Sequence, residues 1–156
     1  MHYEWLIIDG YNVLHKVEEL AQLLGTYIQA ARHRLVRMIE ATALRMAQQT
    51  TIVFDGREAG SDPALTSKQI EIFFSPSHLS ADTIIERLVC KAPNPGQTLV
   101  VTSDHAEHDT VSSAGAQTMS SEEFITQCQV EGKHRPAKRT PPGQEPKLGD
   151  LFPEGF

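Results

Sequence analysis

Three apolar runs that each end in an acidic residue place the strongest constraint on the fold of this chain. Residues 5–9, 50–56 and 98–104 read WLIID, TTIVFDG and TLVVTSD. Continuous apolar runs of this length are typical of strands that are buried on both faces of a parallel sheet. Helical patterns separate the runs, and strands that alternate with helices predict a parallel sheet covered by helices on both faces.

The remaining elements follow from periodicity and capping signals. Residues 70–75 are predicted as a strand, the third in chain order, and residues 116–120 as a short final strand. Residues 57–68 are predicted as a loop. Helices are predicted within residues 17–24, 27–46, 81–91, 106–114 and 120–128, with Ser80 and Ser120 as N-caps. These elements predict an α/β fold, a three-layer α/β/α sandwich with a mostly parallel central sheet.

Length and composition indicate one domain over residues 1–130 and a Pro-rich, flexible C-terminal tail over residues 131–156. The chain has no apolar stretch near the ~20 residues that span a bilayer and no signal peptide pattern, so we expect a cytoplasmic protein without a membrane role. Cys90 and Cys128 lack the spacing of a metal site and are expected to be packing residues. The net charge of −6 argues against a generally basic nucleic-acid-binding surface, although local clusters can outweigh the sum.

Acidic residues gather at the predicted carboxyl ends of the strands, where open parallel sheets bind their ligands. Asp9, Asp55 and Asp104 end the three runs, and Asp82 opens the helix after the third strand, on the same edge of the sheet. Glu86 lies one helical turn beyond Asp82 and is a further candidate. Converging carboxylates repel one another, and Mg²⁺ or Mn²⁺ would remove that penalty because both prefer oxygen ligands.

Each of these residues also has a purely structural interpretation. Asp55 starts an ordinary turn, Asp82 and Asp104 suit helix starts, and Glu86 suits a solvent-facing position. Asn12 either forms a turn or orients water or substrate beside Asp9 without adding charge. The joint placement of the acids at one edge of the sheet favours a functional site, because independent turn-forming residues have no reason to share an edge.

Basic residues are candidates for contacts with phosphate groups. Arg32, Arg34 and Arg37 lie on the helix predicted over residues 27–46, and Arg57 follows the second apolar run. They are candidate RNA contacts, although solvated surface charge is the preferred interpretation for any one of them taken alone. His105 and His108 could bind a ligand or transfer protons, and surface positions are the preferred interpretation for both.

Four motifs together resemble a known family. LIIDGYNVL at 6–14, IVFDG at 52–56, SADTIIERL at 80–88 and VVTSDHAE at 100–107 are similar to the YacP-like branch of the NYN domains, within the PIN-like nucleases. The resemblance implies a flavodoxin-like sandwich whose clustered acids bind divalent metal and cleave RNA endonucleolytically. It assigns the metal-binding acids to Asp9, Asp82 and Asp104, with Asn12 as the accompanying polar residue.

Other positions depart from the family pattern or match it less diagnostically. Asp55 and Glu86 are weaker matches, Gly56 and Arg57 stand where relatives have Ala and then an aromatic residue or His, and the Pro-rich tail lies outside the pattern. The catalytic set expected from the motifs is therefore Asp9, Asn12, Asp82 and Asp104.

The resulting hypothesis is a Mg²⁺- or Mn²⁺-dependent endoribonuclease that cleaves single-stranded RNA, and the resemblance implies a role in mRNA turnover at the ribosome. An alternative is a non-catalytic RNA- or protein-binding module on the same fold. An aspartyl phosphotransferase or phosphatase is least favoured, because those enzymes carry a second Asp two residues after the nucleophile and Tyr11 stands there. The sequence leaves open whether the protein is a monomer or a homodimer.

Overall fold

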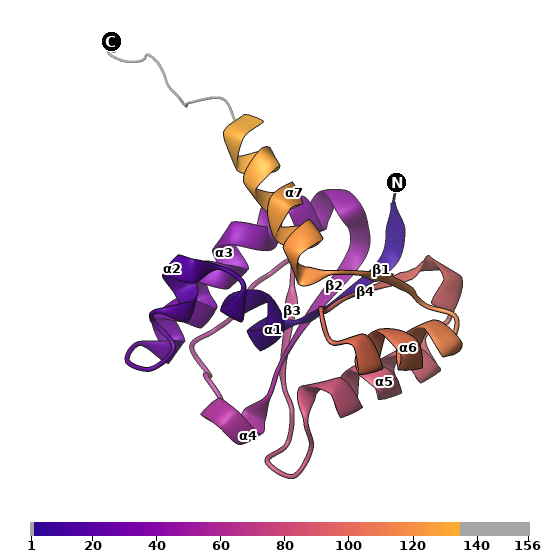
Figure 1. Ribbon diagram of the computed structural model, residues 1–156, viewed down its shortest axis with the longest axis horizontal. Helices are drawn as coiled ribbons and strands as arrows, with labels where there is room; N and C mark the ends of the chain where they lie inside the picture. Colours follow the sequence, from indigo (N-terminus) through magenta and orange to yellow (C-terminus); the bar gives the residue numbers. More distant parts are fainter. Residues whose placement is uncertain (1, 135–156) are drawn as a thin grey trace.

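Five strands form one parallel sheet in the order β3-β2-β1-β4-β5 (Figure 1). The computed structural model describes residues 2–134 of the 156. The strands are β1 (Tyr3–Asp9), β2 (Ala47–Phe54), β3 (Glu71–Phe74), β4 (Thr98–Val101) and β5 (Gln117–Met119). The chain runs outward from β1 to β3, and then returns to the other side of β1 to form β4 and β5. The direction therefore reverses beside β1, and ligands bind at such a point in open sheets.

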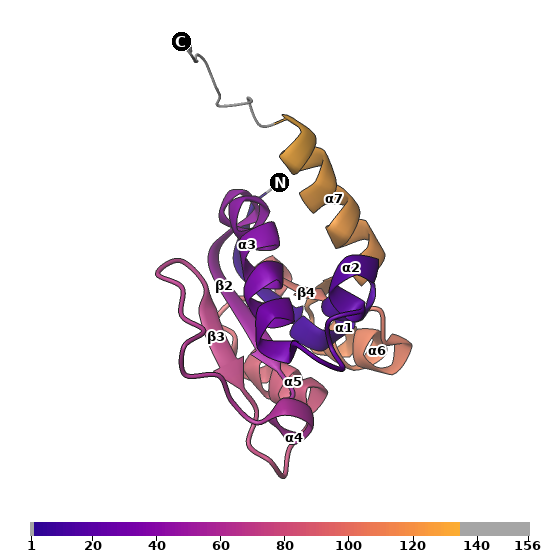
Figure 2. The same cartoon turned by 90° about the vertical axis from the view of Figure 1, so that its left-hand side faces the viewer.

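Helices cover both faces of the sheet, which confirms the predicted α/β/α sandwich. They are α1 (Gly10–His15), α2 (Glu18–Ala21), α3 (Ile28–Met46), α4 (Gly56–Ala59), α5 (Ala81–Lys91), α6 (His105–Ser113) and α7 (Ser121–His134), with a 3₁₀ turn at Pro95–Gln97. Helices α1, α2, α3 and α7 pack on one face, and α5 and α6 on the other (Figures 1 and 2). Flavodoxin itself has the strand order 2-1-3-4-5, so the likeness to that fold lies in the layers.

The central strand explains why the first run is apolar throughout. Leu6 and Ile8 belong to the core beneath α1, α3 and α7, whereas Ile7 belongs to the core beneath α5 and α6. All three are fully buried. Successive side chains of a strand point to opposite faces, and here both faces are covered, so the alternation of polar and apolar residues disappears.

Several predicted boundaries are wrong, and the predicted caps are confirmed. The loop at 57–68 overlaps α4, the helix predicted over 17–24 is regular only over α2, and α7 continues to His134 instead of ending near Cys128. Ser80 Oγ accepts a hydrogen bond from Thr83 N at 3.3 Å, and Ser120 Oγ accepts one from Glu123 N at 3.1 Å. Residues 135–156, which hold most of the predicted tail, lie outside the described residues.

The two Asp-Gly pairs start helices, contrary to the predicted turns. A Cβ atom at Gly10 would lie 2.5 Å from the Phe54 ring, and one at Gly56 would overlap the carbonyl oxygen of Ser75. Neither glycine has a positive φ. Glycine is therefore required for close approach of the backbone to a neighbouring strand, and this close approach brings each preceding aspartate to the edge of the sheet.

Replacing Gly10 with Ala is expected to lower the free energy of unfolding by about 1–3 kcal/mol, because the new methyl group would overpack the core against Phe54. Urea unfolding of the full chain measures this change. Gly25→Ala is the matched control, because a Cβ at Gly25 meets no atom within 4 Å and should leave stability nearly unchanged. Equal effects of the two substitutions would contradict the steric explanation.

Two further expectations concern the cysteines and the membrane. Cys128 is buried, as expected for a packing residue, but Cys90 is exposed, so that expectation is wrong for Cys90. Within the described part of the chain, every helix is too short or too polar to span a bilayer.

Candidate active site

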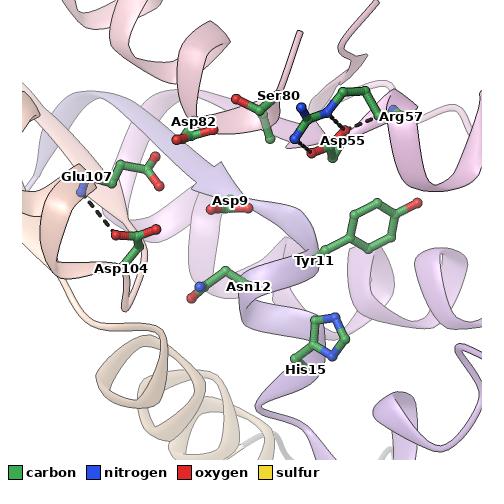
Figure 3. Close-up of a pocket in the computed structure, with 11 residues that line it drawn as sticks. Asp9, Tyr11, Asn12, His15, Asp55, Arg57, Ser80, Asp82, Asp104 and Glu107 are labelled. Carbon is green, nitrogen blue, oxygen red and sulfur yellow. Dashed lines mark hydrogen bonds and ion pairs between the residues drawn. The ribbon is translucent and has the colours of Figure 1, made fainter. Parts of the chain in front are cut away.

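A cavity of about 240 Å³ opens at the carboxyl ends of the central strands, and eleven residues line it (Figure 3). Four of them are carboxylates that point toward one another across the cavity, namely Asp9, Asp82, Asp104 and Glu107. The cavity therefore contains the three acids that the sequence motifs single out, together with a fourth, Glu107.

Each of these carboxylates is placed by the end of a secondary-structure element. Asp9 is the last residue of β1 and the N-cap of α1. Asp104 is the N-cap of α6, and Asp82 lies in the first turn of α5. Because β1 and β4 are neighbouring parallel strands, their carboxyl ends meet at one edge, and the helices that follow begin there.

Half-buried Asp9 and buried Glu107 form an acidic pair. Burial raises the pKa of Asp9, and the nearby charge of Asp82 raises it further, although hydrogen bonds from Glu107 and from the backbone of Asn12 oppose the rise. Burial also raises the pKa of Glu107, and the negative charge of Asp9 adds to that rise. The pair therefore keeps a proton on Glu107 in conditions where an exposed carboxyl group would have lost it.

The surroundings of Glu107 show what this pair lacks. The Thr102 hydroxyl lies 3.2 Å from Glu107 Oε1 and 3.5 Å from Asp9 Oδ2, so its single proton is shared between two acceptors. Glu107 is 2% exposed, and its Oε2 atom is buried with no hydrogen-bond partner among the described residues. A buried oxygen without a partner is costly, and a cation is one partner that would satisfy it.

Glu107 was not among the site residues predicted from the sequence. It occupies the last position of the VVTSDHAE motif, three residues after Asp104, in the first turn of α6. This spacing places its side chain over the same edge of the sheet as the N-cap. The signal was present, but an acid in the first turn of a helix also has an ordinary explanation in the helix dipole.

Asp104 and Asn12 combine structural roles with their place in the cavity. Asp104 Oδ1 accepts hydrogen bonds from the backbone of Ala106 at 2.9 Å and Glu107 at 3.2 Å, so the capping interpretation is confirmed. Asn12 Oδ1 accepts from Ser103 N at 2.9 Å and from Ser121 Oγ at 2.6 Å. The Asn12 oxygen thus ties α1 to the segment before Asp104 and to the start of α7.

Two predicted metal ligands do not join the cluster. Asp55 lines the cavity, but its carboxylate accepts from Arg57 N at 2.9 Å and pairs with the Arg57 guanidinium at 3.3 Å (Figure 3). Its charge is therefore already matched by an arginine. Glu86 is half-buried and does not line the cavity, so its position gives no support to a ligand role.

The predicted RNA contacts divide into three groups. Arg32 is 1% exposed, so its prediction as a phosphate contact is wrong. Arg34 and Arg37 are exposed but line a separate groove between α2, α3 and α7. Arg57 is the arginine that lines the acidic cavity, and its side chain is 51% exposed.

The two histidines that follow β4 lie outside the cavity lining, and His105 is exposed and His108 half-buried, in keeping with the surface positions preferred for both. The Nε2 atom of His108 hydrogen-bonds the carbonyl oxygen of Thr102, and His108 does not line the cavity. The centres of the His105 and His108 rings lie 6.3 Å apart. His15, which the sequence analysis did not single out, lies at the end of α1 and lines the cavity. It is the imidazole that the fold brings to this site.

The donor set fits a hard divalent cation, although the side chains are not already arranged around one. Among residues 2–134, no three histidine, cysteine or acidic side chains converge closely enough to hold a metal ion. The cavity nevertheless supplies carboxylate oxygens, the unpartnered Glu107 Oε2 and a proton that a cation could replace. Mg²⁺ and Mn²⁺ prefer oxygen ligands and keep several waters, so a few carboxylates suffice to bind either ion.

A five-stranded parallel sheet with acids clustered where its central strands end defines the class of this protein as a PIN-like nuclease domain. The chain belongs to the YacP-like NYN domain family, whose pattern matches residues 6–149. This membership confirms the resemblance drawn from the four motifs. The match extends into the Pro-rich C-terminal segment, so the expectation that this segment lies outside the family pattern is wrong.

Individual relatives agree with this assignment. The chain is 26% identical over 127 residues to the uncharacterized protein YacP of Bacillus subtilis (strain 168), spanning 80% of this chain and 75% of that protein. A crystal structure of a mutant of Rae1 (YacP) from Bacillus subtilis matches with a TM-score of 0.68 at 25% identity, over 83% of this chain and 77% of that one. Another crystal structure of Rae1 (YacP) matches at 0.73 and 23%, over 83% and 76%, and supports the fold.

Proposed function

We propose that this protein is a Mg²⁺- or Mn²⁺-dependent endoribonuclease that cleaves single-stranded RNA. The observation that carries the proposal is the cluster of Asp9, Asp82, Asp104 and Glu107 in one cavity, with Asp9 half-buried beside the buried Glu107. Four carboxylates in one small space are unfavourable unless protons or cations neutralise them. Membership of a nuclease family agrees with the use of a cation for this purpose.

The proposed mechanism assigns a role to each side chain. Asp9, Asp82, Asp104 and Glu107 would hold the cation, which supplies an activated water and neutralises charge that develops on the phosphate. With the cation bound, Glu107 would be ionised and its proton released to solvent, and the Thr102 hydroxyl would donate a hydrogen bond to Asp9 or Glu107. At the edge of the cavity, the Arg57 guanidinium would leave its ion pair with Asp55 and bind a phosphate of the RNA strand instead.

The shape of the site supports an unpaired strand as the substrate. A cavity of about 240 Å³ admits a phosphodiester group while the bases remain outside. An unpaired strand can bend its backbone into such a recess, whereas a duplex holds its phosphates on a rigid cylinder. The role at the ribosome, which the family resemblance implied, and the cytoplasmic location, which the lack of a membrane-spanning stretch and of a signal peptide pattern indicated, remain predictions.

A non-catalytic RNA-binding module is the second candidate. The pairing of Asp55 with Arg57 and the absence of a preassembled ligand set within residues 2–134 favour it. This alternative predicts that the protein binds RNA in Mg²⁺ or Mn²⁺ without cleaving it.

Incubation of the full chain with end-labelled single-stranded RNA separates the two candidates. We expect internal cleavage in Mn²⁺ or Mg²⁺ and none in excess chelator. Asp82→Asn should lower the cleavage rate at least about 10²-fold, because it removes a carboxylate that would hold the cation. Glu86→Gln is the matched control on the same helix and should keep the wild-type rate. Binding without turnover, or equal rates for the two variants, would overturn the proposal.

A further inference from the structure

We propose that the buried ion pair between Arg32 and Asp62 is a positioning element that holds one wall of the cavity, and with it Arg57, in place for the RNA backbone. The inference rests on the proposed function. It gives Arg32 a role other than the direct phosphate contact expected from its sequence, and it brings in Asp62, which no motif identifies.

The pair is enclosed by protein on all sides. Arg32 Nη2 lies 3.4 Å from Asp62 Oδ2, and both side chains are 1% exposed. The guanidinium carbon of Arg32 lies 5.3 Å from the centre of the Phe74 ring. His33 Nε2 contacts the same Asp62 oxygen at 3.1 Å from a side chain that is 42% exposed. Helix α3 is thereby joined to the segment between α4 and β3.

The other end of the guanidinium reaches the residue beside the catalytic acid. Arg32 Nη1 donates a hydrogen bond to the hydroxyl of Tyr11 at 2.9 Å. Tyr11 lines the cavity two residues after Asp9, and its side chain extends away from the carboxylates (Figure 3). Its ring lies 5.1 Å from that of Phe54, the residue before Asp55. Arg32 therefore fixes the Tyr11 side of the cavity.

Asp62 fixes the opposite end of the same wall. It follows α4 by three residues, and α4 carries Arg57, the arginine that lines the cavity. The carbonyl oxygen of Asp62 accepts a hydrogen bond from Leu65 N at 3.0 Å, and Leu65 belongs to the core under α1 and α3. The segment that leaves α4 is thus held at Asp62 through both its side chain and its backbone.

Stability alone is a poor explanation for this arrangement. A buried ion pair recovers the cost of desolvation only when its remaining polar atoms are satisfied, and apolar side chains of similar volume often stabilise a protein equally well or better. The Nε atom of Arg32 is buried without a partner among the described residues. The pair instead provides directional contacts to Tyr11, Asp62 and Phe74 at once, which apolar residues cannot reproduce.

This role predicts a specific division of effects. The four carboxylates lie on β1, α5 and α6 or at their ends, and the pair contacts none of them, so cation binding and the chemical step should change little. Loosening the wall should misplace Arg57 and weaken RNA binding. We expect KM for RNA to rise about tenfold, as for loss of a phosphate contact, with kcat within about twofold of wild type.

The test compares four forms of the full chain. They are the wild type, a double variant with Arg32→Met and Asp62→Leu (the apolar pair), the single variant Arg57→Gln, and a triple variant with all three substitutions. The apolar pair keeps side-chain volume without burying a lone charge, so thermal unfolding should remain near wild type. Arg57→Gln should raise KM about tenfold, and adding the apolar pair should raise it no further, because both changes act through one contact. Mn²⁺ titration should be equal in all four proteins.

Wild-type KM in the protein with the apolar pair would overturn the proposal, as would effects that multiply with those of Arg57→Gln. If the apolar pair prevents folding, Asp62→Asn serves as the second variant and should raise KM at least about threefold. If wild-type protein binds RNA without cleaving it, the proposed function fails but the same comparison is made on Kd. If wild-type protein does not bind RNA, both proposals fail.

Discussion

Asp9→Asn is expected to lower the rate of RNA cleavage about 10³-fold while leaving the protein folded. Asp9 is the carboxylate at which β1 ends and lies between Glu107 and Asp82, so it is the acid most central to the cluster. Asparagine keeps the shape of the side chain but removes the negative charge that would hold the cation and, with it, the water that the cation activates. Single-turnover cleavage in Mn²⁺, with circular dichroism to confirm folding, measures the effect.

The same substitution should also weaken Mn²⁺ binding, which calorimetry measures without any need for turnover. Asp109→Asn is the matched control, because Asp109 is an exposed acid on α6 that does not line the cavity. Full activity in a clean preparation of Asp9→Asn would contradict the assignment of the site. Loss of activity in both variants would point to damage of the fold instead.

Glu107→Gln is expected to change how the free energy of unfolding depends on pH, and also to lower the rate of RNA cleavage. Burial and the charge of Asp9 raise the pKa of Glu107 to about 9, above its ordinary value near 4.5. Between these values the folded protein keeps a proton that the unfolded chain releases. The free energy of unfolding of the metal-free protein should therefore fall as pH rises through this window, by up to about 1.4 kcal/mol per pH unit.

Glutamine imitates the protonated side chain at every pH, so Glu107→Gln should flatten this dependence. At pH 8.5 in chelator the variant should be more stable than wild type by at least about 1 kcal/mol, whereas at pH 5 the difference should be smaller. Mn²⁺ should stabilise wild type more than the variant, and the cleavage rate of the variant should fall. Urea unfolding at the two pH values, with and without Mn²⁺, gives all of these comparisons.

Identical pH dependence in wild type and Glu107→Gln would show that the pair does not hold a proton. Asp109→Asn again provides the control, because an exposed carboxyl group on the same helix should leave the slope unchanged. Both substitutions replace a carboxyl group on α6 with an amide, at a buried position for Glu107 and at an exposed one for Asp109.

Local patterns in the sequence were sufficient for the frame of this protein. The apolar runs at β1, β2 and β4 identified strands buried on two faces, and the serine at position 80 placed the start of α5 correctly. Because parallel strands share a carboxyl edge, the same patterns also brought Asp9, Asp82 and Asp104 to one cavity. These inferences need only the period of the side chains and the rules of connection.

The errors arose wherever the answer depended on a distant partner. The turns considered at Asn12 and Asp55 did not anticipate that Gly10 and Gly56 are required by the close approach of Phe54 on β2 and of Ser75, which follows β3. Arg32 resembled its neighbours Arg34 and Arg37 in sequence, yet its buried position is set by Asp62 and Tyr11. A pattern of charges along one helix does not reveal which charge will meet a partner from another element.

By itself the sequence determined the alternation of strands and helices, the edge at which the acids gather and the family to which the chain belongs. Tertiary structure decided which acids share the cavity without a basic partner: Glu107 joined Asp9, and Asp55 was neutralised by Arg57. The physical reason is that burial and charge pairing depend on distances in space between side chains, and those distances are fixed only when the elements pack together.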